Sequence, residues 1–420
     1  MSNVIQRDKW RFNALNSFLF FSIISSFAIF RFIFLDFLGE NSILIFYSLF
    51  IFGSSLFLAT PIGILPKQFI VLLYVVVVIV LQIFLPVLSG PDEVRFHKNV
   101  SEYSIGELIG SIKSSFDISK PSFVSSALTF STYVRLLSGS ATKAFPELIA
   151  VLNCSALLYS SSLFVRSVKI SYGTIVYSEK TFLISVFAFL MLSPSSIYWS
   201  ATYAKDITSL AFCLFAAVML FQKRILLFLI FLVLATSLRV YAIVPIILYY
   251  ICLSINFTYI KFSVVFSVIL LFVITDFNII ILMNLVLATA FLFISPNPLN
   301  QANWMLLQGE GTWVFSPLWF TLEGIVLGVF FVIGLAFLVR GIFKKDYTFV
   351  LLYLSILCCA SILVLVGYHL TVVSLGDDYR FGKLGENLVR KKFIVWPIIA
   401  LWIGLIVDRL WRSLTFLFKR

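Results

Sequence analysis

The chain has 420 residues, of which 61% are hydrophobic and only 12% are charged, and its formal net charge is +12. A mean hydropathy of +1.06 is more than the surface of a soluble domain tolerates. The composition therefore excludes an ordinary soluble protein and indicates a protein of the lipid bilayer.

Apolar runs of roughly membrane-spanning length recur from Leu15 to Val407. Backbone groups in lipid must pair within their own segment, and the runs lack the alternation of a membrane barrel, so they predict α-helices. The predicted fold class is all-α, a polytopic membrane helical bundle of about twelve crossings, with interfacial helices in its outward loops. The crossings lie near Leu15–Leu38, Ser42–Ile64, Gln68–Leu88, Pro146–Val165, Thr181–Ile197, Ile207–Phe221, Ile225–Ser237, Val240–Ile255, Phe262–Thr275, Phe320–Val339, Thr348–Val366 and Phe393–Val407.

Basic residues set the predicted orientation of this single membrane domain, 1–420. With both termini in the cytoplasm, the short segments on that side carry essentially all of the net charge of +12, which is the positive-inside bias. The outward segments are the long or chemically dense ones: 89–145, 198–206, the turn around Arg239, 295–319 and 367–392. In the first of them, the spacing of Ile105, Leu108, Ile109, Ile112 and Phe116 predicts a short helix on the membrane surface.

The first outward segment contains the run GPDEVRFH, directly after an apolar run. Gly90 and Pro91 stop the preceding helix, so Asp92 and Glu93 are expected just beyond the membrane face. Partial desolvation there raises the pKa of a carboxyl group toward the value that a general base needs. A solvated loop is the alternative interpretation.

Two further outward segments place charges at the membrane surface. Lys205 and Asp206 open a helix, where a lysine would neutralise a phosphate; a simple helix cap with a snorkelling lysine is the alternative. Arg239 lies between two apolar runs with no room for a loop, and a charge there costs roughly 2.5–3.5 kcal/mol on insertion scales. That cost predicts an anionic partner, which is either a ligand or a structural salt bridge to Asp276.

The last outward segment is rich in basic residues, although short outward loops usually avoid them. Arg380 is followed by Arg390, Lys391 and Lys392 directly before the final crossing. A phosphate held by a guanidinium fork and by ammonium groups would compensate this positive charge. A permissive loop or a different topology would also account for it.

The segment 295–319 is rich in amide and tryptophan side chains, which suit the hydroxyls and the apolar ring faces of sugars. Just beyond it, Glu323 lies in an apolar run, where a lone carboxylate is expensive. We expect Glu323 to meet one of the basic residues, in a catalytic role or in a structural ion pair. Together the outward sites predict glycosyl transfer from a lipid-linked phosphate or diphosphate donor.

At these residues the chain resembles the bacterial polytopic membrane glycosyltransferases of C type and the O-antigen polymerase-like proteins. The resemblance is carried by the pieces PDEVRFH, YWSATYAKD, SLRVYAIVP, SPNPLN to TLEG, and ENLVRKKFIVWP. The early position of the long segment 89–145 is closer to the C-type proteins. Chain length, the number of crossings and the lack of a soluble domain are closer to the polymerases.

The resemblance implies an enzyme of the bacterial inner membrane that acts at the periplasmic face on undecaprenyl-linked sugars, most concretely an O-antigen or polysaccharide repeat-unit polymerase. The candidate residues fall into a base, phosphate ligands and supporting groups: Asp92 or Glu93; Lys205, Arg239, Arg380, Arg390 and Lys391; and His97, Asp206 and Glu323. Two alternatives stay open. One is a C-type transferase that uses a polyprenyl-monophosphate sugar donor, and the other is a flippase or transporter of lipid-linked oligosaccharides.

The expected partners are an undecaprenyl-linked oligosaccharide or sugar, membrane lipid and, by resemblance, a chain-length regulator, with no nucleic acid. No cofactor and no metal ligand are assigned, although Asp92 and Glu93 could hold a divalent cation through their oxygens. The five cysteines lie inside apolar runs, so we expect neither a disulfide nor a zinc site.

Overall fold

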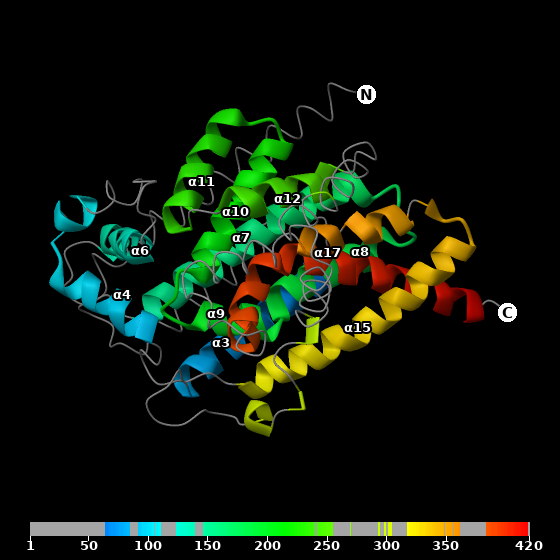
Figure 1. Cartoon of the computed structure of the whole chain (residues 1–420), viewed down its shortest axis with the longest axis horizontal. Helices are drawn as coiled ribbons and strands as arrows, with labels where there is room; N and C mark the ends of the chain where they lie inside the picture. The colour runs from blue at the N-terminus through cyan, green and yellow to red at the C-terminus, as the bar shows by residue number, and fades with distance from the viewer. Residues whose placement is uncertain are drawn as a thin grey trace. The chain divides into compact units, whose positions relative to one another are not determined.

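The structure is a computed structural model of the whole chain (Figure 1). It describes residues 64–84, 91–104, 106–110, 123–138, 146–239, 242–254, 269, 293–294, 298–299, 301–304, 317–347, 349–355, 357–361 and 384–418. All regular structure in these residues is helical, which confirms the predicted all-α class for this part of the chain.

Eleven α-helices and one short 3₁₀-helix have well-defined bounds in the described residues. In chain order they are α3 (Ile64–Phe84), α4 (Pro91–Glu102), α6 (Phe123–Ser138), α7 (Pro146–Tyr172), α8 (Glu179–Leu192), α9 (Pro194–Ala201), α10 (Asp206–Phe221), α11 (Ile225–Leu238), α12 (Ile243–Ser254), η2 (Gln301–Trp304), α15 (Pro317–Phe343) and α17 (Leu384–Phe418). A further apolar helix runs over Phe349–Ser361.

Two described helices are long and apolar enough to cross a membrane, Leu318–Phe343 in α15 and Ile394–Phe416 in α17. The pair α8 and α9 is a third candidate span, bent by 41° at its break. The membrane-like helical character is therefore shown for the described residues. The count of twelve crossings stays a prediction, because the first two crossings and nearly all of 262–293 lie outside the described residues.

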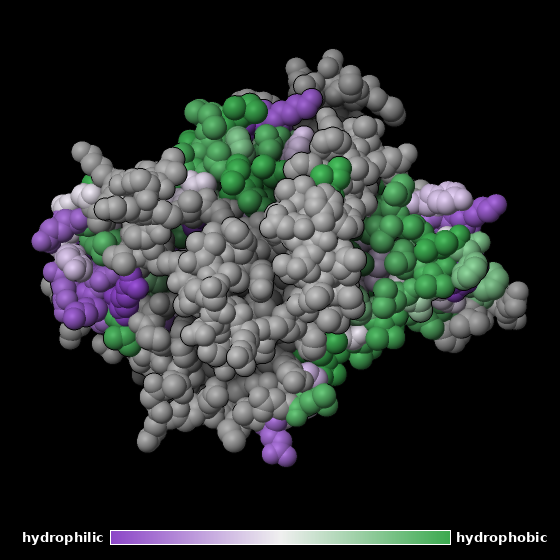
Figure 2. All heavy atoms as spheres, in the orientation of Figure 1, coloured by the Kyte–Doolittle hydropathy of each residue, from purple (hydrophilic) through white to green (hydrophobic). Residues whose placement is uncertain are grey.

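Large apolar side chains are exposed along single helix faces, as lipid-facing helices require. On α15 they recur at helical spacing, at Leu322, Val326, Val329, Val332, Leu335, Val339 and Ile342. Figure 2 shows apolar atoms over α11 and α15 and hydrophilic atoms over α4. A stripe of this length is far larger than the scattered apolar residues of a soluble surface, so it indicates contact with lipid.

The chain forms two compact units, each built from three stretches of sequence. Unit 1 consists of Met1–Leu163, Ile197–Ala211 and Ser237–Val240, and unit 2 of Phe164–Ser196, Phe212–Thr236 and Tyr241–Arg420. Helices α7, α9, α10 and α11 contribute residues to both units.

In unit 1, the run that directly follows the predicted crossing Gln68–Leu88 is helical and not a solvated loop. Pro91 suits the first turn of α4 because that turn needs no N–H donor. The spacing of Glu93, Phe96 and Val100 gives α4 one buried face. This face packs on α6, where the rings of Phe96 and Phe130 lie edge to face at 5.0 Å. The helix of 106–110 was predicted, whereas α4 and α6 were not.

In unit 2, α8 packs antiparallel against α17. Near the end of α8, Phe189 stacks on Trp396 at 4.7 Å, and at its start the N–H groups of Tyr177 and Ser178 donate to Asp408, late in α17. Gly404 allows close approach, because a Cβ there would lie 2.6 Å from Val186. These contacts join the two helices along their length.

Several predicted boundaries need correction. The single crossing Thr181–Ile197 is broken, because Pro194 cannot continue α8 and instead starts α9. Helix α7 continues past Val165 to Tyr172. Helix α17 is longer than the predicted crossing Phe393–Val407, since it begins at Leu384 and ends at Phe418 with Pro397 inside it.

Candidate functional site

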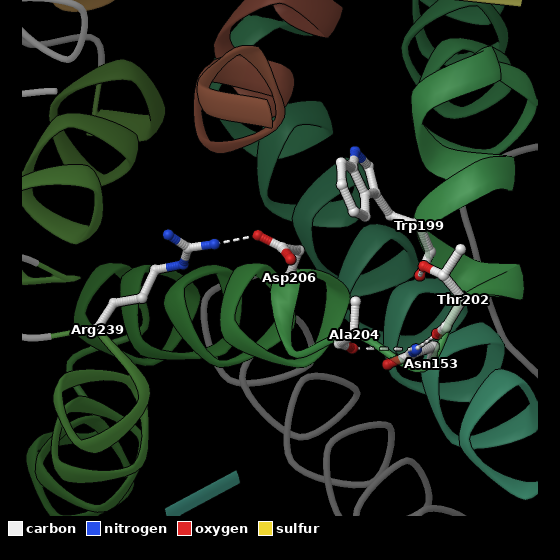
Figure 3. Close-up of polar contacts among 6 residues, drawn as sticks. All are labelled: Asn153, Trp199, Thr202, Ala204, Asp206 and Arg239. Carbon is white, nitrogen blue, oxygen red and sulfur yellow. Dashed lines mark hydrogen bonds and ion pairs between the residues drawn. The ribbon is translucent and has the colours of Figure 1, made fainter. Parts of the chain in front are cut away.

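In unit 1, Lys205 ends the turn 202–205, here called the α9–α10 turn. Asp206 follows as the first residue of α10, where a carboxylate suits the positive end of the helix dipole. Its side chain is 1% exposed and pairs with the guanidinium of Arg239, which is 16% exposed (Figure 3). The anionic partner that the sequence requires for Arg239 is thus Asp206. Asp276, the partner considered from the sequence, lies outside the described residues.

Asn153, a fully buried residue of α7, holds the α9–α10 turn. Its Nδ2 donates to the carbonyl oxygens of Thr202 (3.3 Å) and Ala204 (3.4 Å), and its Oδ1 accepts a hydrogen bond from Thr208 (3.0 Å). Figure 3 shows the amide reaching the turn from α7, apart from the ion pair. Because both donors are satisfied by backbone oxygens, this one side chain fixes the backbone that leads into Lys205.

Helix α4 contacts the same turn with its buried face. The ring of His97 lies edge to face with Tyr203 at 6.0 Å, and the ammonium of Lys205 lies 6.0 Å from the ring centre of Phe96. Glu93 is 7% exposed and lies on this face, about one helical turn before Phe96. The structure thereby brings the segment of the predicted base and two of the predicted phosphate ligands, Lys205 and Arg239, into one compact unit, whereas Arg390 and Lys391 belong to unit 2.

Hydrogen bonds from neighbouring helices hold both flanks of this region. The hydroxyl of Tyr74 in α3 donates to Ser200 in α9 over 2.6 Å. On the other side, the hydroxyl of Tyr133 in α6 lies 2.7 Å from the hydroxyl of Ser237 in α11. Ser237 comes two residues before Arg239. These two contacts show that described helices lie on both flanks of the α9–α10 turn.

Glu323 lies in unit 2, near the start of α15, and is 4% exposed. Its carboxylate accepts hydrogen bonds from the N–H (2.7 Å) and the hydroxyl (2.8 Å) of Ser195, and the basic partner expected from the sequence stays a prediction. Ser195 lies in the first turn of α9, whose positive dipole end suits a carboxylate. Trp396 donates to Ser193 beside this break in the helix (2.6 Å).

Four predicted site residues have side chains that lie outside the described part. Asp92 belongs to α4, and Arg390 and Lys391 belong to α17, so their helical backbone alone is described. Arg380 lies entirely outside the described residues. Their assigned roles stay predictions.

The described residues include no group of three or more His, Cys, Asp or Glu side chains that could hold a metal ion. A divalent cation bound with the help of Asp92 stays a prediction.

Sequence reasoning missed two residues of this region, Asn153 and Tyr203. A polar amide inside the apolar run Pro146–Val165 is itself a signal, because an amide in lipid requires partners. Tyr203 gave no such signal, since a tyrosine near a membrane surface is common. Its significance follows only from its burial, at 1% exposed.

Comparison of the chain with protein-family models, curated proteins and solved structures gives no match.

Proposed function

We propose that this protein is a membrane glycosyltransferase of surface polysaccharide synthesis that acts on sugars linked to polyprenyl phosphate or diphosphate, and that it joins repeat units as a polymerase. The observation that carries the proposal is the gathering of Glu93, Lys205, Asp206 and Arg239 in unit 1. Glu93 and Asp206 are buried, and buried charges are expensive in an apolar protein, which favours a site. The resemblance described above supports the same chemistry.

In the proposed reaction, the acid pair of α4 supplies the base. Glu93 or Asp92 takes the proton of the acceptor sugar hydroxyl, and that oxygen forms a bond to the anomeric carbon of the donor. The bond from this carbon to the phosphate oxygen breaks, and its electron pair leaves with the lipid diphosphate. The total charge is conserved, since the proton stays on the carboxyl group.

The cations stabilise the departing phosphate. Lys205 supplies a compact ammonium charge, and Arg239 supplies a planar guanidinium that suits phosphate oxygens. Asp206 positions Arg239 by holding one of its Nη atoms. Because these groups are fixed before the substrate binds, little reorganisation is needed when charge develops on the leaving group.

Two other functions remain as outcomes of the test. A C-type transferase that adds a single sugar is favoured by the chemically dense early segment, in which α4 meets the α9–α10 turn. A flippase is favoured by the buried Glu323 at the broken pair α8 and α9, because transporters place broken helices at their binding sites.

Deletion of the gene separates these functions. We expect the mutant to make lipopolysaccharide whose core carries one repeat unit and no long chains. Core that lacks even one repeat unit would indicate a flippase or an earlier transferase, and unchanged long chains would contradict the proposal.

Complementation then tests the site, at matched protein levels. Glu93→Gln, Asp92→Asn and Arg239→Ala should each fail to restore long chains. The matched control is Glu102→Gln on α4, whose side chain is 59% exposed and pairs with Lys98 one helical turn away, and it should restore them. Full activity of the first three variants would contradict the assigned residues.

A further inference from the structure

Tyr203 lies in the middle of the α9–α10 turn and has a buried side chain. Its side chain is 1% exposed, and its hydroxyl is enclosed without a hydrogen-bond partner among the described residues. The rings of His97 (6.0 Å) and Phe130 (6.3 Å) contact it edge to face. Burial raises the pKa of Tyr203, so the phenol stays protonated at neutral pH and is available as a donor.

Packing alone does not explain this hydroxyl. Nine-tenths or more of buried polar groups in proteins have a partner, and a phenylalanine would fill the same space between His97 and Phe130 without the cost of an unmet O–H group. Tyr74 in the same unit shows the ordinary case, since its buried hydroxyl donates to Ser200 over 2.6 Å.

The backbone around Tyr203 is fixed on both sides. Asn153 binds the carbonyl oxygens of Thr202 and Ala204, the residues that flank it. The phenol is therefore carried by a rigid turn, two residues from Lys205. A donor held in this way binds a ligand oxygen at little entropic cost.

We infer that the Tyr203 hydroxyl donates a hydrogen bond to a phosphate oxygen of the lipid-linked donor, as a binding residue on the same turn as Lys205. This inference rests on the proposed function and extends it, because it assigns a neutral donor to a phosphate site otherwise made of cations. A phosphate oxygen fits because Lys205, two residues further along the same turn, carries an ammonium charge that selects an anion.

The test compares Tyr203→Phe with the matched variant Tyr74→Phe in purified full-length protein. The first probe is undecaprenyl phosphate in detergent micelles, and the second is inorganic pyrophosphate. We expect Tyr203→Phe to weaken binding of both probes about tenfold or more, as for a hydrogen bond to a charged group. Its thermal unfolding temperature should be unchanged or higher, because an unmet buried polar group is removed.

Tyr74→Phe should show the opposite pattern, with a lower unfolding temperature and probe affinity close to that of the wild type. If Tyr203 is purely structural, Tyr203→Phe should lower the unfolding temperature and leave the affinity for both probes unchanged. That result would overturn the inference. Normal probe binding with a raised KM for lipid-linked sugars would place the hydroxyl on the sugar and overturn the phosphate assignment. A wild type that binds neither probe would contradict the proposed function itself.

Discussion

At the α9–α10 turn of unit 1 the enclosed groups are a carboxylate, a guanidinium, an amide and backbone carbonyls. At the α8–α17 interface of unit 2 they are aromatic rings and a glycine, and charged groups lie toward the helix ends. Arg409 of α17 pairs at 2.9 Å with Asp346, which follows α15, and the two side chains are 19% and 33% exposed. Asp408 is buried but is used to satisfy the N–H groups ahead of α8.

The two regions differ in how they treat charged groups that are removed from water. Removing two ions from water costs several kcal/mol for each, and their attraction often only offsets this cost. In unit 2 the described ion pairs are partly exposed, and the buried carboxylates of Asp408 and Glu323 accept hydrogen bonds from N–H and hydroxyl groups. Unit 1 buries the carboxylate of Asp206 against the guanidinium of Arg239, as the proposed phosphate site requires.

Breaking the buried pair should have the largest effect on stability. Arg239→Ala or Asp206→Ala leaves one charge without its partner, and we expect each to lower the free energy of unfolding by about 3–5 kcal/mol. The double variant Asp206→Leu with Arg239→Met removes both charges, so its stability should return close to the wild type. Denaturant unfolding of protein purified in detergent measures all three.

The double variant also separates folding from function. It should remain folded and yet fail to restore long polysaccharide chains in the deletion strain. A double variant that folds and restores them would show that the pair is structural.

Glu323 is the buried acid of unit 2 and should give the next largest effect. Glu323→Ala removes the acceptor of two hydrogen bonds from Ser195, and hydrogen bonds to a charged group contribute about 1.5–3 kcal/mol. The measurement is the shift in thermal unfolding temperature. Ser195→Ala removes only the hydroxyl donor, so its loss should be smaller; an equal or larger loss would contradict the assigned contacts.

The apolar interface of unit 2 is tested at Gly404. A Cβ at this position would lie 2.6 Å from Val186 and 2.8 Å from Phe182, so Gly404→Ala should cost about 1–3 kcal/mol by overpacking. Gly328→Ala is the control, because its nearest neighbour would be Ile294 at an ordinary 3.5 Å. Unfolding curves of the two variants should differ clearly, and equal curves would argue against the close packing of α8 and α17.

The smallest effect is expected at an exposed ion pair. Lys169 and Glu179 lie 2.9 Å apart with side chains 45% and 40% exposed, so Lys169→Ala should lower stability by about 0.2–1 kcal/mol. High salt should remove most of the difference from the wild type. A loss of stability as large as that of Arg239→Ala would contradict the expected difference between exposed and buried ion pairs.

The helical class and the charged residues of the site could be predicted from sequence because both depend on local patterns. Apolar runs of membrane length can satisfy their backbone only as helices, and Arg239 stands out because a lone charge in such a run is costly. The partner of Arg239 could not be read in this way. Asp206 is 33 positions away, and only the packing of α10 and α11 brings the two together.

Other features were hidden because they depend on tertiary contacts. The run at Asp92 and Glu93 is strongly polar, so its helix was missed; the buried face of α4 becomes apparent only when α6 covers Phe96. In the sequence, Asn153 is one amide among apolar neighbours, and its role in holding the turn follows only from its contacts with the carbonyl oxygens of Thr202 and Ala204. The break at Pro194 was visible, yet its consequence, a second short helix, was not.

The most direct test of the central claim is the amount of undecaprenyl diphosphate released by the purified protein in liposomes supplied with lipid-linked repeat units extracted from the deletion strain. The wild type should release this product as the sugar chains lengthen. The folded Asp206→Leu, Arg239→Met double variant should release almost none. Equal release by both proteins, or no release by the wild type, would contradict a phosphate site at Arg239.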